Sequence, residues 1–133
     1  MRIIIAGSRG FNKYNLLHDQ CYNIFHQLSD EGLLTGDIFI DVSNMEIVSG
    51  TARGVDQLGE KLAEDYKIKV KQFYPDWNKY GKSAGYRRNE EMAIYAKEDN
   101  GVLIAFHDGV SKGTKHMIDL ANKHGLRVFV VNY

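Results

Sequence analysis

Three short segments combine glycine with a hydroxyl group and a cation: residues 7–11 (GSRGF), 49–56 (SGTARGVD) and 108–114 (DGVSKGT). Glycine allows the backbone to approach a ligand, and the first N–H groups of a following helix attract an anion. Arginine adds a planar fork for phosphate oxygens, and serine or threonine adds a short donor. Each segment alone fits an ordinary strand-to-helix turn with a capping residue equally well. Three segments of like composition favour a phosphate pocket.

A fourth segment, residues 77–89 (WNKYGKSAGYRRN), passes from a polar aromatic loop into a helix. Its aromatic rings are suited to stacking on a base. Arg88 and Asn89, one turn into the predicted helix, are placed to point a cation and an amide at phosphate or ribose. Packing in the core or at its rim is the stronger alternative for Trp77, and a solvated helix face is the stronger alternative for Tyr86 and Arg87.

The predicted ligand-binding residues come from all four segments. They are Gly7, Ser8, Arg9, Phe11, Ser49, Gly50, Ala52, Arg53, Gly54, Asp56, Trp77, Arg88, Asn89, Ser111, Lys112, Gly113 and Thr114.

Several enzyme motifs are absent or poorly supported. The chain has no GxGxxG fingerprint and no GxxxxGK[ST] loop, which weakens a simple NAD-binding or ATPase interpretation. Residues 109–113 match GxSxG, but Asp119 and His124 fall on the same predicted helix as the motif, so a hydrolase triad is rejected. Ser111 is better interpreted as a helix cap or phosphate ligand. The histidines do not show the HxxxH or HExxH spacing of metal ligands, so we expect no metal site. His116, near the 108–114 segment, is the one exception that we keep as a candidate.

The elements that position these segments alternate between strand and helix. Continuous β-branched apolar runs at 3–6, 46–48, 102–106 and 128–131 predict strands buried on both faces, and residues 69–73 supply another. Helical spacing connects them. The sequence therefore predicts an α/β fold, a single-domain Rossmann-like parallel sheet flanked by helices on both faces. The carboxyl ends of such strands form the ligand edge. Residues 37–42 fit either an additional edge strand or one arm of a hairpin, and the pattern does not decide between the two.

Composition sets the outer limits. A chain of 133 residues predicts one domain spanning 1–133. Seventeen basic and 17 acidic residues give zero net charge, which argues against a broad surface for long nucleic acid. One cysteine permits no internal disulfide, and no apolar run reaches a membrane span, so we expect a cytoplasmic protein without a membrane partner.

Although the net charge of the chain is zero, its basic residues are concentrated in a few segments. Seven of the 17 basic residues fall in or beside the four segments, as expected for a pocket that takes a small anion. They are Arg9, Arg53, Lys82, Arg87, Arg88, Lys112 and Lys115.

Together the motifs resemble a known family. The four are GSRxF at residues 7–11, SGxARGxD at 49–56, WxxxGxxAGxxRNxxM at 77–92 and SKGT at 111–114, in an order that resembles the YspA-like (YpsA-related) branch of the SLOG superfamily. The resemblance runs from residue 2 to residue 131. It implies a Rossmann-like fold that binds nucleotides or nucleotide-derived ligands through these loops, with no further cofactor required. The superfamily includes the DNA-processing protein DprA and the LOG phosphoribohydrolases.

The resemblance also bears on catalysis. LOG enzymes cleave the N-glycosidic bond of a nucleoside monophosphate with a glutamate three residues after a Gly-Thr pair, and that position here is Met117. A thioether does not ionise, so Asp56 and Glu90 are the remaining, weak catalytic candidates. Our leading hypothesis is a binder of a phosphate-bearing nucleotide derivative, ADP-ribose-like or cyclic, for sensing or for sequestration in phage and host conflict. The alternatives are a LOG-like nucleotide hydrolase and, least favoured, a DprA-like DNA-binding module. We also expect a homo-oligomer.

Overall fold

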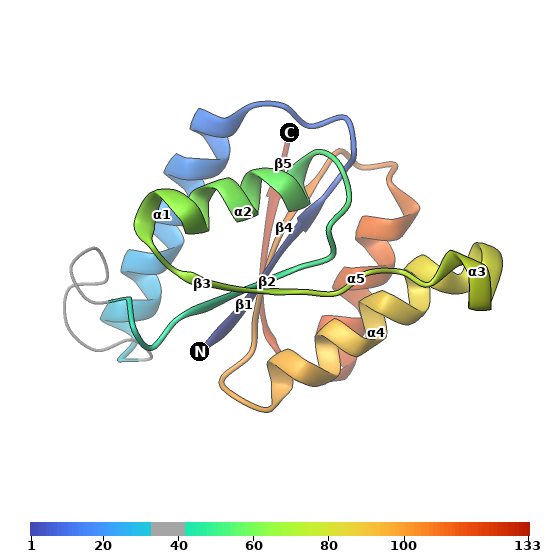
Figure 1. Cartoon of the computed structure of the whole chain (residues 1–133). Helices are drawn as coiled ribbons and strands as arrows, with labels where there is room; N and C mark the ends of the chain where they lie inside the picture. The colour runs from blue at the N-terminus through green and yellow to red at the C-terminus, as the bar shows by residue number, and fades with distance from the viewer. Residues whose placement is uncertain (33–41) are drawn as a thin grey trace.

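The computed structural model describes residues 1–32 and 42–133, and within them the chain forms one parallel sheet (Figure 1). Its strands are β1 (Arg2–Gly7), β2 (Glu46–Ser49), β3 (Lys69–Gln72), β4 (Val102–His107) and β5 (Arg127–Asn132). Their order is β3-β2-β1-β4-β5, and every neighbouring pair is parallel. The predicted Rossmann-like α/β fold is therefore confirmed. The possible strand at 37–42 lies almost wholly outside the described residues.

Helices cover both faces of this sheet (Figure 1). The covering helices are α1 (Tyr14–Asp30) and α2 (Val55–Tyr66) on one face, and α4 (Ala84–Lys97) and α5 (Lys112–Lys123) on the other. The short α3 (Trp77–Tyr80) and the 3-10 turn η1 (Gly81–Ser83) lead into α4 and contact it. None of the helices in the described ranges is long and apolar enough to span a lipid bilayer.

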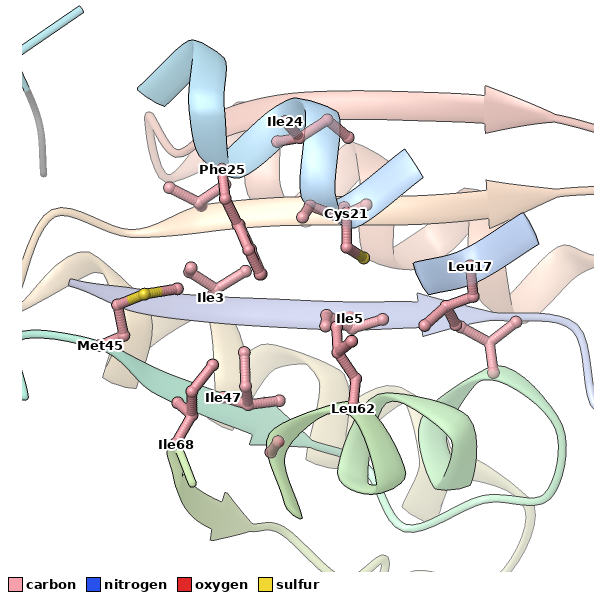
Figure 2. Packing of buried hydrophobic residues seen from close by; sticks show 14 of the residues in the cluster. Ile3, Ile5, Leu17, Cys21, Ile24, Phe25, Met45, Ile47, Leu62 and Ile68 are labelled. Atoms are coloured by element: carbon pink, nitrogen blue, oxygen red, sulfur yellow. The ribbon is translucent and has the colours of Figure 1, made fainter. Parts of the chain in front are cut away.

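The central strand β1 divides its side chains between two cores. Ile3 and Ile5 point to the core beneath α1 and α2, where Leu17 and Phe25 of α1 meet them (Figure 2). Ile4 is in the other core, beneath α4 and α5. Successive residues of a strand point to opposite faces, so a run of apolar residues without alternation is what a strand covered on both sides requires.

Two features differ from the sequence-based expectation. Residues 128–131 were predicted to be buried on both faces, but β5 is an edge strand whose side chains are half-buried or exposed, with Val130 43% exposed. The segment 77–89 was predicted to pass from a loop into a helix, but its first residues already form α3 and η1. The Asp76 side chain begins α3 by accepting a hydrogen bond of 3.0 Å from the backbone N–H of Lys79.

The strand order creates a crevice at one edge. From β1 the chain moves to β2 and β3 on one side, whereas β4 and β5 lie on the other side. The loops that leave β1 and β4 therefore diverge, and at such a switch point a ligand can enter outside the carboxyl ends of the strands. The first three glycine-containing segments all lie at this edge.

Candidate functional site

A two-lobed cleft lies at the carboxyl edge of the sheet. The first lobe, of about 450 Å³, lies between the end of β1, the first half of α4 and the start of α5. The second lobe, of about 560 Å³, lies beside the loop after β2 and the segment after β3. Four residues line both lobes, and we call them the waist: Arg9, Ala52, Trp77 and Arg88.

Most of the predicted ligand-binding residues line this cleft. Besides the waist, the first lobe takes Gly7, Asp56, Asn89, Ser111, Gly113 and Thr114, and the second takes Gly50 and Arg53. The four segments, which are far apart in the sequence, thus contribute to two adjoining cavities.

Close backbone contact fastens the first two loops to each other. Gly54 has a φ of 77°, and a Cβ there would lie 2.3 Å from the Ser8 carbonyl oxygen. That oxygen accepts hydrogen bonds from the N–H groups of Phe11 at 3.4 Å and Val55 at 3.3 Å. Only glycine permits this approach without displacing one of the loops. Gly54 is therefore required for the shape of the loop, and it does not line the cleft.

A buried hydroxyl braces the loop after β2. Ser49 donates a hydrogen bond of 2.6 Å to Glu60 Oε2 on α2, and its oxygen accepts from the Thr51 N–H at 3.1 Å. This contact holds a turn in which Thr51 has a φ of 65°, a conformation that costs free energy outside glycine. Ser49 is 1% exposed and lines neither lobe. Its hydroxyl is committed within the protein.

Arg88 and Asn89 connect the loops across the waist. Arg88 is 9% exposed; its Nη1 donates to the Gly50 carbonyl, and its Nε donates to Asn89 Oδ1 at 3.1 Å. Asn89 Nδ2 donates to the Gly113 carbonyl at 3.4 Å and lies 3.2 Å from His116 Nδ1. Burial lowers the pKa of Arg88, and Asp56 counteracts that effect. The guanidinium is oriented by the protein before any ligand arrives.

Asp56 is the only carboxylate of the described residues that lines either lobe. It is 6% exposed, and its Oδ2 accepts a hydrogen bond of 3.1 Å from the Ala52 N–H. Burial raises the pKa of Asp56 to about 6, although the Ala52 N–H and the Arg88 guanidinium both favour the charged form. A group with this pKa can exchange a proton near neutral pH.

The start of α5 closes the first lobe. Ser111 caps the helix: its Oγ accepts from the Thr114 N–H at 3.4 Å and lies 2.9 Å from Thr114 Oγ1. Asp108 lies outside the helix and accepts the N–H groups of Val110 at 2.9 Å and Ser111 at 2.8 Å. Gly113 and Thr114 thus present the positive end of a twelve-residue helix to the cleft.

The remaining predicted residues lie elsewhere. Phe11 is 4% exposed and packs against Phe106, with ring centroids 5.4 Å apart. The Ser8 hydroxyl bonds to the Tyr133 hydroxyl. Lys112 and the weak catalytic candidate Glu90 are exposed and line neither lobe.

Some of the seven basic residues in or beside the four segments line the cleft, and others do not. Arg9, Lys82 and Arg88 line the first lobe, and Arg53 lines the second. Arg87 lies over the Tyr80 ring, and Lys115 pairs with Asp119 at 2.9 Å.

Some lining residues were absent from the sequence-based set. Tyr74 and Pro75 follow the carboxyl end of β3, so the edge rule that selected the other loops would have found them. Tyr86 lies three residues before Asn89 on α4, and Met117 lies three residues after Thr114 on α5; helical spacing places each on the face of a predicted residue. Metal ligands do not cluster anywhere in 1–32 and 42–133.

Comparison with known proteins gives two matches. A family model described as "YspA, cpYpsA-related SLOG family" matches residues 1–80, which include the loops after β1 and β2. The "Gene 61 protein" of Mycobacterium phage D29 is 32% identical over 132 residues, covering 96% of this chain and 93% of that protein. No solved structure matches significantly.

Proposed function

The chain belongs to the YspA, cpYpsA-related SLOG family, and on that premise we propose that its cleft captures a phosphate-bearing nucleotide derivative for sensing or sequestration. Membership of this family suggests a nucleotide-related function on a Rossmann-like fold. The proposal adds that the ligand is bound and released without being cleaved.

The arrangement of the waist carries this proposal. Arg88 is a nearly buried cation that keeps donor capacity beyond its bonds to Gly50 and Asn89, and Arg9 adds an exposed cation beside it. A planar guanidinium held in place matches the geometry of phosphate oxygens. Trp77 is 50% exposed at the same waist, and its ring offers a surface for a base.

The chemistry of the lining favours binding over cleavage. Met117 is 1% exposed and lines the first lobe, at the position where the resemblance to LOG enzymes places a catalytic glutamate. We extend the proposal to a role in phage and host conflict because one relative is a phage protein, and a protein that retains a nucleotide signal would withdraw it from its receptor.

Isothermal titration against a panel of mono- and dinucleotides tests the proposal, with chromatography of the recovered ligand. We expect saturable binding and unchanged ligand. Arg88→Gln and Arg9→Gln should each weaken binding at least about tenfold, because charge-assisted bonds to phosphate are lost. Arg87→Gln is the matched control on the same helix, since Arg87 is exposed and outside both lobes. The absence of binding to every member of the panel contradicts the proposal.

A second candidate function rests on Asp56. A carboxyl group with a pKa of about 6 inside the cleft has the properties of a general acid or base near neutral pH, as hydrolysis of an N-glycosidic or phosphate bond requires. Release of free base or phosphate from a nucleotide, abolished in Asp56→Asn, would favour this hydrolase. Recovery of all nucleotides intact after long incubation excludes it.

A further inference from the structure

The two lobes adjoin each other, because they share the four lining residues of the waist. Each lobe alone falls within the range of small-molecule pockets, roughly 300 to 1,000 Å³. Because Arg9, Ala52, Trp77 and Arg88 line both, a molecule bound at the waist contacts both lobes. A ligand that fills only one lobe leaves the other lobe to water.

Positive charge is concentrated between the lobes. Arg9 and Arg88 are both at the waist, and each lobe adds one exposed cation, Lys82 in the first and Arg53 in the second. The nearest carboxylate, Asp56, is held by the Ala52 N–H and carries a raised pKa. The strongest anion-binding position is therefore the middle of the cleft.

Exposed aromatic rings occur on either side of that position. Tyr86, 47% exposed, lines the first lobe, and its ring centroid is 4.2 Å from that of His116. Tyr74, 67% exposed, lines the second lobe. Trp77 lies between them at the waist. Large exposed rings within a cleft provide flat apolar surfaces on which bases can stack.

Resting on the proposed function, we infer that the ligand class is a dinucleotide: two base-bearing arms joined by an anionic linker of the pyrophosphate or phosphodiester kind. The linker lies at Arg9 and Arg88, and one arm enters each lobe. A mononucleotide carries its anion at one end, so with its phosphate at the waist it occupies a single lobe.

Titration of the full chain with related probes tests this inference. The probes are AMP, ADP, diadenosine pyrophosphate, their guanosine counterparts and inorganic pyrophosphate. We expect a dinucleotide to bind at least about tenfold more tightly than the diphosphate with the same base, because a second base contributes stacking in the second lobe. Inorganic pyrophosphate should bind more weakly than either.

Variants of one lobe at a time assign the arms. Tyr74→Leu and Tyr86→Leu should each weaken dinucleotide binding several-fold, whereas the diphosphate should respond to at most one of them. Both side chains are largely exposed, so the fold should tolerate these changes, and Arg87→Gln serves again as the control.

The results separate the two proposals. Equal affinity for the dinucleotide and the diphosphate overturns the two-armed ligand and leaves nucleotide binding intact. Pyrophosphate binding as tight as that of the dinucleotide also overturns it, because it reveals a simple anion site. Failure of every nucleotide to bind overturns both proposals.

Discussion

Asp56→Asn should stabilise the protein at neutral pH and have little effect at acidic pH. Asparagine retains an oxygen for the Ala52 N–H, which Asp56 Oδ2 accepts at 3.1 Å, and it removes a buried negative charge. Burial raises the pKa of Asp56 from 3.8 to about 6, and a difference of that size corresponds to about 3 kcal/mol at pH 7. This net shift already includes the attraction to Arg88. Asparagine replaces the carboxyl hydroxyl with an amide group that needs its own acceptors, so we expect a gain of about 1 to 3 kcal/mol in unfolding free energy.

The sign follows from where the proton is held. Between about pH 4 and pH 6 the native state binds a proton at Asp56 that the unfolded state releases, so this group makes the wild-type protein less stable as pH rises. Below the unfolded-state pKa both states are protonated and the penalty vanishes. The variant has no such slope, and its advantage should grow through this window and level off above it.

Urea unfolding of both proteins from about pH 4 to about pH 7.5 measures this difference by linear extrapolation. The exposed Asp30→Asn at the end of α1 is the control for a simple change of net charge. A constant difference between Asp56→Asn and wild type across the range, or a less stable variant at pH 7, would refute the reasoning. Diadenosine pyrophosphate has no phosphate group that titrates near pH 6, so its affinity for the wild type should rise as pH falls through about 6, and its affinity for the variant should remain flat.

Three further predictions follow from the same geometry. Gly54→Ala brings a Cβ within 2.3 Å of the Ser8 carbonyl oxygen at a φ of 77° and should cost roughly 2 to 4 kcal/mol of unfolding free energy. Gly109→Ala, at a φ of 89° with no neighbour within 4 Å, should cost about 1 kcal/mol, so equal losses would contradict the steric argument. Trp77 is the single tryptophan, so nucleotide binding should change the intrinsic fluorescence; an unchanged spectrum at saturation would place its ring outside the ligand site. Met117→Glu, which buries a carboxylate in the first lobe, should lower stability by about 3 kcal/mol and weaken nucleotide binding, whereas Met117→Leu should cost less than about 1.5 kcal/mol and retain it.

The sequence predicted the positions of the strands more accurately than the burial of their side chains. The runs at Ile3–Ala6 and Val102–Phe106 are strands covered on both faces, and they pair with each other in the structure. The similar run at Val128–Val131 is at the edge, where no strand within residues 1–32 and 42–133 pairs with its far side. Apolar composition indicates a strand, but strand order sets its burial, and strand order depends on long-range pairing that a local pattern does not contain.

The same limit applies to the site. Glycine and arginine identified the loops because glycine gives the backbone freedom, and arginine the planar positive charge, that suit a phosphate pocket. Residue type did not reveal that the Ser49 hydroxyl is occupied by Glu60, eleven residues away on α2, or that Phe11 belongs to the core. Whether a polar group is available to a ligand depends on its partners in the fold.

The cleft therefore depends on two kinds of residue: those that fix the loops around it and those that keep polar groups free to contact a ligand. Ser49 and Asn89 use hydrogen bonds within the protein, and Gly54 allows a close backbone contact. All three hold the loops in place. Arg88 is fixed through two of its nitrogens, at Gly50 and Asn89, and keeps further donors for a ligand. Binding then requires little reorganisation of the waist, which reduces the entropic cost of association. The buried Asp56 charge is the destabilising counterpart, because the attraction of Arg88 does not fully compensate for the burial of the carboxylate.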